Sequence, residues 1–287
     1  MPRAKVQRIN EGDTSVTTKR GQKVRIGGLN APDLHRRSAE ERQERRERVK
    51  EQLLGFGGTL TEGATFTGDA EADEFLRSDP FAFLVAASLD RGARAESVWK
   101  IPWLLAQRLG RLDPNRLGET ASSDLEGILR ALPRKPRFPN QAARTIISLA
   151  RLVSDELNGD ADKAWVGKPV ASVLGFLQRV YGVGPGIAAM TVRILIDEGL
   201  YKPQHAELAQ IDIKPDVHTT RVFYRCGLAS SRDERDCKYA ARTLHPEFPA
   251  KLDWPAWEIG RSYCHETNPL CATCPLDNVC PKQGFGA

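Results

Sequence analysis

The fold is decided by the segment VYGVGPGIAA, which spans residues 180–189. Apolar residues at helical spacing lead into a tight turn at Gly182, Val183 and Gly184, and a second apolar helix begins directly after it. Glycine lets such a turn adopt positive φ and lets a neighbouring backbone approach closely. The second helix would present unpaired N–H groups and the positive end of its dipole to the outside, which favours a phosphate. Two helices joined by glycines are also an ordinary turn, so the chemistry depends on residues further along the chain.

Downstream, four of the six cysteines crowd into seventeen residues with the spacing Cys-x6-Cys-x2-Cys-x5-Cys: Cys264, Cys271, Cys274 and Cys280. In a chain without an export signal, such a group indicates a metal site rather than disulfides. Structural zinc usually pairs one CxxC with a second, and the ferredoxin run of short gaps is absent. The uneven gaps are compatible with a cubane cluster wrapped by one loop, with zinc as the alternative. Cys226 and Cys237 are expected to be buried core thiols.

Between the turn and the cysteines lies the segment KPDVHTTRV, residues 214–222. Asp216 precedes a predicted helix, at a position where aspartate commonly acts as the N-cap. His218 follows it by two residues, and an orienting or structural role suits this histidine better than general-base chemistry.

In this order, the turn, the aspartate segment and the cysteine spacing resemble the helix-hairpin-helix DNA glycosylases of the endonuclease III superfamily. The resemblance covers most of residues 79–284, and NQAA at 140–143 and WEIGR at 257–261 fall in register as well. It implies a [4Fe–4S] cluster held by the four clustered cysteines, and double-stranded DNA as the partner. It also assigns a grip on the DNA backbone to the hairpin residues Gly182, Val183, Gly184 and Gly186.

The resemblance further implies the reaction. Such enzymes flip a nucleotide out of the duplex and cleave its N-glycosidic bond, which develops positive charge on the sugar. Asp216 matches the family's catalytic aspartate, which stabilises that charge and positions the attacking water. The family's wedges, which fill the place of the flipped base, correspond by register to Arg91 in the elbow 90–94 and to Phe138 in the loop 136–140. Both residues also suit plain structural roles, as a solvated arginine and a core aromatic.

One departure from the family concerns the mode of cleavage. Bifunctional members carry a lysine two residues past the second glycine of the turn, and its amine attacks C1′ and permits strand cleavage. This chain has Gly186 at that position, which predicts a monofunctional enzyme that leaves an abasic site. A lysine from another position, such as Lys168 or Lys214, is the alternative source of lyase activity. A non-catalytic DNA-binding iron–sulfur protein is the alternative from a different functional class.

A second departure concerns the base. The family's adenine glycosylases carry a glutamate where this chain has Ala87, so adenine excision is disfavoured. Glycine at 186 also removes a side chain from the pocket wall, which suits a bulky hypermodified base such as a phage-type substituted cytosine. The simpler alternative is uracil or mismatched thymine, with Tyr181 or a neighbour filling the gap. The role, repair or defence against foreign DNA, stays open together with the substrate.

Helical periodicity with Pro and Gly breaks predicts an all-α, two-lobed fold. A capping box at residues 38–41 opens a helix that is expected to run to about Leu54. Residues 57–78 have the composition of a linker, and a short strand-like piece near Val24 is ambiguous. Further helices are predicted from Pro80 to the elbow, through Trp99, and at 102–110, 122–132, 140–157, 169–180 and 187–199.

The expected organisation has four parts. They are a basic N-terminal extension (1–34), an N-terminal helix and linker that pack with the cluster lobe (35–78), a helical barrel that ends in the hairpin (79–200), and the catalytic aspartate segment with the cluster loop (201–287).

The composition bounds the class of protein. The 287 residues carry 42 Lys and Arg against 37 Asp and Glu, and the formal net charge of +5 weakly favours a polyanionic partner. The longest apolar run, residues 81–89, is far shorter than the roughly 20 residues that span a bilayer, which excludes a membrane protein. The first ten residues lack the apolar core of a signal peptide. A monomeric, cytoplasmic protein is expected, nucleoid-associated if the source is bacterial.

Overall fold

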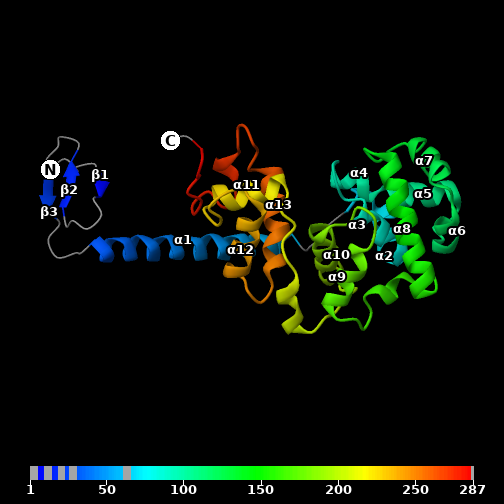
Figure 1. Ribbon diagram of the computed structural model, residues 1–287. Helices are drawn as coiled ribbons and strands as arrows, with labels where there is room; N and C mark the ends of the chain where they lie inside the picture. Colours follow the sequence, from blue (N-terminus) through cyan, green and yellow to red (C-terminus); the bar gives the residue numbers. More distant parts are fainter. Residues whose placement is uncertain (1–5, 10–14, 19–22, 26–30, 61–65, 286–287) are drawn as a thin grey trace. The chain divides into compact units, whose positions relative to one another are not determined.

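The computed structural model of the chain describes residues 6–9, 15–18, 23–25, 31–60 and 66–285. The chain divides into two compact units, Met1–Val49 and Lys50–Ala287 (Figure 1). Parts of the expected N-terminal extension (1–34) and of the expected linker (57–78) therefore lie outside the described residues.

The N-terminal unit contains an antiparallel sheet, in the order β1 (Val6–Ile9), β2 (Ser15–Thr18) and β3 (Lys23–Arg25). Val16 of β2 pairs with Val24 of β3, so the ambiguous piece near Val24 is a strand. The expected basic N-terminal extension thus contains short strands. Strands of three or four residues are too short to show the alternation by which a strand is recognised in a sequence.

Helix α1 (Ala31–Thr59) is longer at both ends than the expected helix that opens at the capping box and runs to Leu54. A proline in the first turn, here Pro32, is compatible with a helix start because its missing N–H has no helical partner there. At the other end the helix continues through its glycines. A Cβ atom on Gly57 would lie 3.2 Å from Cγ of Pro255, so close packing outweighs the poor helix propensity of glycine.

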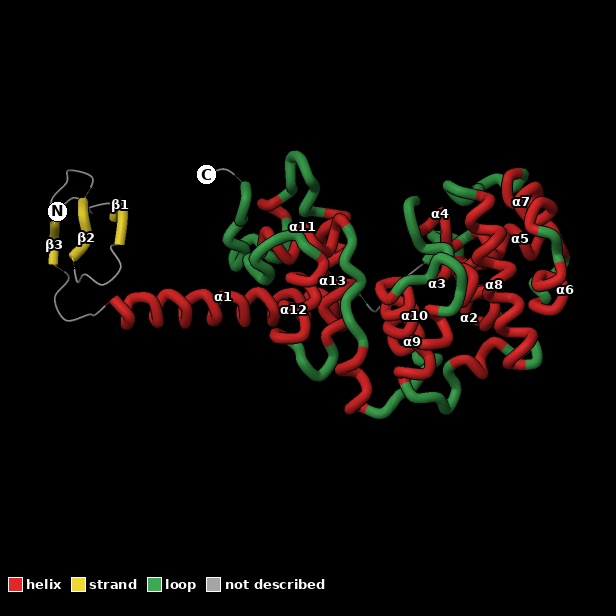
Figure 2. Tube along the Cα trace, in the orientation of Figure 1, coloured by secondary structure: helices red, strands yellow, loops and turns green. Residues whose placement is uncertain are grey.

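In the unit Lys50–Ala287, all described secondary structure is helical and is arranged in two lobes (Figure 2). The first lobe contains α2 (Ala70–Ser78), α3 (Pro80–Ser88), α4 (Ala95–Trp99), α5 (Ile101–Leu109), α6 (Pro114–Glu119), α7 (Ser122–Arg130), α8 (Pro139–Leu157), α9 (Val170–Gln178) and α10 (Pro185–Asp197). The second contains α11 (Val217–Arg225), α12 (Glu234–Leu244) and α13 (Asp253–Ser262). The predicted all-α, two-lobed fold is confirmed for this unit. No described helix is long and apolar enough to cross a membrane.

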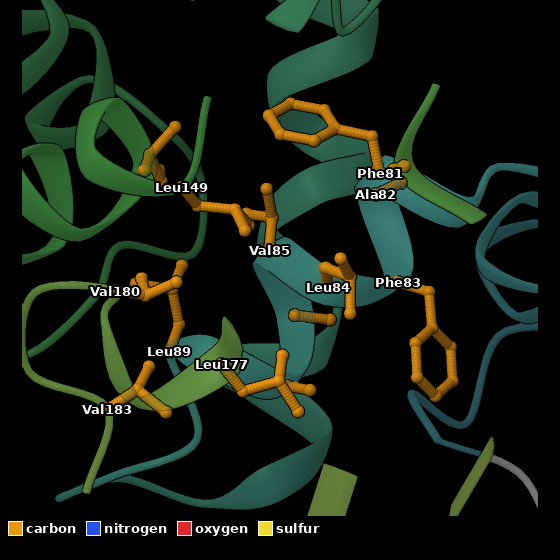
Figure 3. Packing of buried hydrophobic residues seen from close by; sticks show 14 of the residues in the cluster. Phe81, Ala82, Phe83, Leu84, Val85, Leu89, Leu149, Leu177, Val180 and Val183 are labelled. Atoms are coloured by element: carbon orange, nitrogen blue, oxygen red, sulfur yellow. The ribbon is translucent and has the colours of Figure 1, made fainter. Parts of the chain in front are cut away.

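Helix α3 forms the centre of the first lobe because it is apolar on every side. Pro80 occupies its first turn, and the Asp79 carboxylate caps it by accepting a hydrogen bond of 2.9 Å from the backbone N–H of Ala82. Figure 3 shows side chains of the α9–α10 hairpin, Val180 and Val183, beside Leu89 at the end of this helix. The hairpin is therefore attached to the core by its apolar residues, which leaves its glycines at the surface.

Helix α2 lies inside the stretch expected to be a linker, so that expectation is wrong. The Asp69 side chain caps it through the backbone N–H of Ala72, and Leu76 is fully buried. The buried Asp73 carboxylate accepts hydrogen bonds from the backbone N–H (2.9 Å) and the hydroxyl (2.7 Å) of Thr67. An amphipathic helix of nine residues among Gly, Thr and acids offers too few apolar positions for its period to stand out.

The second lobe is held together by a close approach between α11 and α13. A Cβ atom on Gly260 would lie 2.7 Å from the carbonyl oxygen of His218, so the two helices pack with no room for a side chain. The last turns of α1 dock on the same lobe, where Nε2 of Gln52 donates hydrogen bonds to the carbonyl of Pro275 (2.6 Å) and to Oδ1 of Asn278 (2.8 Å). These contacts place the start of α11 at a fixed position beside α13.

Candidate functional site

Asp216 is the N-cap of α11. Its Oδ1 accepts hydrogen bonds from the backbone N–H groups of His218 (2.8 Å) and Thr219 (2.9 Å). Its Oδ2 has no hydrogen-bond partner among the described residues. One oxygen therefore fixes the orientation of the carboxylate, and the other is available to chemistry.

A groove of about 1460 Å³ passes Asp216. The N-terminus of α10 contributes Gly184, Pro185, Gly186 and Ile187 to its wall, so the unpaired N–H groups of that helix face the groove. Seven basic residues line it against four acidic ones, and the basic ones are Arg91, Arg94, Arg134, Arg137, Lys214, Lys238 and Arg261. A groove with this excess of positive charge suits a polyanion.

A pocket of about 380 Å³, here called the Asp216 pocket, opens from this groove. Asp90, Lys214, Asp216, Trp257 and Arg261 line both spaces, so the carboxylate of Asp216 stands where the two meet. The walls of the pocket carry four aromatic side chains, which are Phe66, Trp99, Trp254 and Trp257. Such a pocket can enclose a flat ring. The free oxygen of Asp216 would then lie next to that ring, at the entrance of the pocket.

The hairpin residues divide into two pairs. Gly184 and Gly186 line the groove, whereas Val183 is buried in the core and is 6% exposed. Gly182 has φ +80°, and its carbonyl accepts a hydrogen bond from Nη1 of Arg91. A Cβ atom at this position would overlap that guanidinium, so both backbone conformation and space require glycine.

The side chain of Lys214 packs against Gly186. A Cβ atom on Gly186 would lie 3.4 Å from Cγ of Lys214. Nζ of Lys214 donates to Oδ2 (3.0 Å) and to the carbonyl oxygen (3.1 Å) of Asp90, and contacts Sδ of Met190 at 3.2 Å. Lys168, the other lysine named from the sequence, is exposed and lines neither the groove nor the pocket.

A buried ion pair that the sequence does not reveal lies in the wall of the Asp216 pocket. Asp253 is 5% exposed; its Oδ1 accepts a hydrogen bond of 3.1 Å from the backbone N–H of Lys214, and its Oδ2 lies 3.8 Å from Nε of Arg193. Burial raises the pKa of Asp253 to about 7; Arg193 lowers this pKa, Asp216 raises it and Lys214 lowers it. No sequence signal separates this acid from any other at the start of a helix.

The two wedge candidates are neighbours. Arg91 donates to the hairpin carbonyl and, over 2.7 Å, to Oγ1 of Thr145, and burial lowers the pKa of its guanidinium. Phe138 is 49% exposed, and the guanidinium of Arg137 lies 5.2 Å from the centre of its ring. The guanidinium of Arg91 is thus held by hydrogen bonds to the protein and is not simply solvated. The ring of Phe138 lies at the surface and not in the core.

Two residues named in connection with the base lie away from the Asp216 pocket. Tyr181 is in the wall of a different cavity, with its ring 4.0 Å from the guanidinium of Arg144, and does not line the Asp216 pocket. Its backbone N–H is held by Oγ of Ser148, which turns the residue to the other side of the hairpin. Ala87 is fully buried in the core of α3.

His218 lies on the groove, beside Asp216. Its Nδ1 is 3.1 Å from Nη2 of Arg221, and its ring meets the edge of Trp257 at 6.3 Å. These contacts hold the imidazole in place, as an orienting or structural residue requires.

The four clustered cysteines line one pocket, and Cys226 lines it with them. Cys226 and Cys237 are both buried, as expected, but Cys226 is a neighbour of the cluster ligands rather than a remote core thiol. Two N–H groups approach the sulfurs, from Nη1 of Arg225 to Cys264 (3.5 Å) and from the backbone of Lys282 to Cys280 (3.4 Å). Among the described residues, no three His, Cys, Asp or Glu side chains form a group that could hold a single metal ion.

Comparison with known proteins found relatives, although no family model matches the chain. Endonuclease III of Thermotoga maritima is 25% identical over 204 residues, which cover 71% of this chain and 83% of that protein. Thymine-DNA glycosylase of Aeropyrum pernix is 22% identical over 223 residues, which cover 74% of this chain and 87% of that protein. Over more than two thirds of its length, this chain is therefore similar to endonuclease III and to thymine-DNA glycosylase.

Solved structures of an endonuclease III and of a thymine-DNA glycosylase share the fold of this chain. A non-covalent endonuclease III–DNA complex aligns with a TM-score of 0.60 at 19% identity and covers 83% of this chain and 95% of that one. A thermostable thymine-DNA glycosylase aligns with a TM-score of 0.57 at 19% identity and covers 84% and 97%. At this level of identity the alignments establish the fold.

Proposed function

We propose that the protein is a DNA N-glycosylase that flips a base of duplex DNA into the Asp216 pocket and hydrolyses its glycosidic bond. The observation that carries this proposal is the position of Asp216, with one free carboxylate oxygen at the junction of a basic groove and an aromatic pocket. The names of the relatives, endonuclease III and thymine-DNA glycosylase, support it. In this proposal α2 and residues 79–200 form the barrel lobe, and residues 50–60 and 201–287 form the lobe of the catalytic aspartate.

The geometry assigns roles to this chain's groups. The N-terminus of α10 and the groove cations hold the phosphates on either side of the target nucleotide. As the bond between C1′ and the base nitrogen breaks, its electron pair leaves with the base and positive charge develops on the sugar. The Asp216 carboxylate stabilises this charge and accepts the proton of the water that attacks C1′. Arg91 and Phe138 fill the gap in the stacked duplex.

The test is the release of free bases, measured by mass spectrometry, from duplexes that each carry one candidate base. The set includes uracil, mismatched thymine, oxidised, alkylated and substituted bases. Release from at least one duplex, with an abasic site left in the strand, is expected. Firm binding of the duplexes without release from any of them would leave a non-catalytic DNA-binding protein.

We further propose that the enzyme is monofunctional. Gly186 supplies no amine, and Nζ of Lys214 is committed to two oxygens of Asp90 and to the sulfur of Met190. An ammonium held in an ion pair has no lone pair with which to attack C1′. A second candidate function, glycosylase with lyase activity, is favoured by one observation: the Lys214 side chain lies over Gly186 and reaches the pocket. Movement of the elbow that carries Asp90 would free its amine.

Borohydride reduction distinguishes the two modes, because it traps an imine between a lysine and the sugar as a covalent protein–DNA adduct. For the monofunctional enzyme we expect no adduct, and strand breaks only after alkali. An adduct that persists in Lys168→Ala and is absent in Lys214→Ala would establish Lys214 as the nucleophile and overturn the monofunctional proposal.

We propose that Cys264, Cys271, Cys274 and Cys280 hold a [4Fe–4S] cluster. The donor set fits, since four thiolates line one pocket and two N–H groups point at two of the sulfurs. A single zinc ion requires its four sulfurs to converge on one point. The cysteines of a [4Fe–4S] cluster would each bind a different iron, so their sulfurs need not converge. Arg225 also donates to the carbonyls of His265 (2.5 Å) and Glu266 (2.9 Å), so it fastens the loop to α11. The cluster would supply the cross-link that folds this loop.

Iron and sulfide analysis tests this assignment. We expect about four irons per chain in protein purified without oxygen, and loss of the iron and of the visible absorbance in Cys274→Ala. Cys237→Ala is the matched control, because this buried thiol lies outside the cysteine pocket. Stoichiometric zinc instead of iron would contradict the assignment.

A further inference from the structure

We infer that the Asp216 pocket accepts a base that carries a bulky, hydroxyl-rich substituent of the sugar type. This inference rests on the proposed glycosylase function and names the substrate class of its site. It chooses between the two substrate classes that the sequence leaves open, the small uracil or thymine and the bulky substituted pyrimidine.

The size of the pocket is the first reason. A volume of about 380 Å³ falls in the range of about 300–1,000 Å³ that is typical of pockets for drug-sized ligands. Uracil and thymine are single six-membered rings, and either would leave much of this space empty. Neither Gly186 nor Tyr181 reduces the space, because the first lines the groove and not the pocket, and the second lies in another cavity.

The chemistry of the inner end, the part that the groove does not share, is the second reason. Its lining includes the carboxyl groups of Asp197, Glu198, Asp253 and Glu258 and the guanidinium of Arg193. Arg193 is 7% exposed; its Nη1 donates to Oδ2 of Asp197, and its Nε lies 3.8 Å from Oδ2 of Asp253. The guanidinium and the carboxylates thus form a charged network in the wall, to which the hydroxyls of a ligand can add hydrogen bonds.

A hydroxyl group is more complementary to these wall groups than other substituents are. It donates to a carboxylate and accepts from a guanidinium, so several hydroxyls can use both kinds of wall group at once. An apolar substituent would displace water from these charged groups and offer them no hydrogen bond in return. An amine would serve the carboxylates and repel Arg193. The mixed lining therefore favours a neutral, polyhydroxylated group.

The aromatic side chains supply the remaining part of such a site. Trp257 lies at the border with the groove, where the base ring would rest, and Trp254 lies at the inner end. An indole face packs against the C–H groups of a sugar ring, while the polar groups around it bind the hydroxyls. The hydrolysis is the same for this substrate. Water supplies the hydroxyl to C1′, Asp216 accepts the water's proton and passes it to the departing base, and the base leaves with its substituent intact.

The test compares duplexes that carry glucosylated 5-hydroxymethylcytosine, unglucosylated 5-hydroxymethylcytosine, uracil opposite guanine, mismatched thymine and a pyrimidine with an amine-bearing substituent. We expect kcat/KM for the glucosylated base to exceed that for its unglucosylated parent by about 100-fold or more, since a polar site discriminates strongly against ligands that lack its partners. Faster release of uracil or thymine would overturn the inference and leave the glycosylase proposal standing. A preference for the amine would show that the pocket reads charge, and would overturn it as well.

Two variants test whether the pocket is responsible. Trp254→Ala and Glu258→Gln are each expected to lower the preference for the glucosylated base by about tenfold. Trp103→Ala is the matched control, because this partly buried tryptophan of α5 lines neither the pocket nor the groove. An unchanged preference in both folded pocket variants would place the recognition elsewhere and overturn the inference. Absence of release from every duplex would instead count against the glycosylase function itself.

Discussion

Replacing Asp216 with asparagine is expected to lower the rate of base release by about 10²–10⁴-fold while the protein keeps its stability. The amide oxygen of asparagine can accept the two N–H groups that Oδ1 accepts now, and asparagine is as good an N-cap as aspartate. The variant therefore loses the negative charge beside the sugar and little else. Single-turnover release and thermal unfolding, measured on the same preparation, check both halves of this result.

Asp216→Ala separates the two roles of the side chain. It should lose release to a similar degree and should also lose about 1 kcal/mol of stability, because α11 loses its cap. Asp233→Ala is the matched control: Asp233 caps α12 through the N–H of Arg235 (2.8 Å), lies outside the groove, and its loss should cost stability alone. Release by Asp216→Asn within tenfold of the wild type would show that another group stabilises the sugar cation.

The free energy of unfolding is expected to fall as pH rises from about 4 to about 7, through the ionisation of Asp253. The pKa of this buried carboxyl is raised to about 7 in the folded protein, so the folded state binds its proton more tightly than the unfolded state does. The stabilisation is fully present below the unfolded pKa near about 3.9 and is lost as pH passes the folded value. A shift of about three units corresponds to about 4 kcal/mol.

Asp253→Asn should remove this part of the pH dependence, because the amide stays neutral and its oxygen can still accept from the N–H of Lys214. Denaturant unfolding at about pH 5 and about pH 8, on either side of the raised pKa, gives the comparison, with the variant more stable than the wild type at the higher pH. Asp155→Asn, at an exposed position of α8, is the control and should leave the wild-type curve in place. Parallel curves for wild type and Asp253→Asn would mean that Asp253 is ionised in the folded state throughout this range.

Local patterns in the sequence predict much of this molecule. The glycine turn predicts the hairpin, and the apolar residues around it predict its attachment to α3, because both depend on neighbours within a few positions. The helix cap at Asp216 is predicted in the same way. By contrast, the strands near Val24 are too short to show alternating apolar residues. Helix α2 has too few apolar residues among Gly, Thr and acids for a helical spacing to be recognised.

The wall of the Asp216 pocket shows why the rest was not predicted. Asp253 and Arg193 are sixty residues apart, and neither has a local signal that separates it from a surface residue. The same holds for Lys214 and Gly186, which lie 28 residues apart in the chain and pack against each other. The position of Tyr181 in the chain, next to the turn, likewise does not indicate on which side of the hairpin its ring lies.

The cap at Asp216 also bears on how activity can be lost in evolution. Folding alone is satisfied at this position by aspartate, asparagine or serine, since each can accept the first N–H groups of α11. A single-nucleotide change from aspartate to asparagine would silence the chemistry and leave a stable protein that still holds DNA. Selection for a stable fold therefore does not maintain a negative charge at residue 216. Only selection for the reaction would keep an aspartate there over generations.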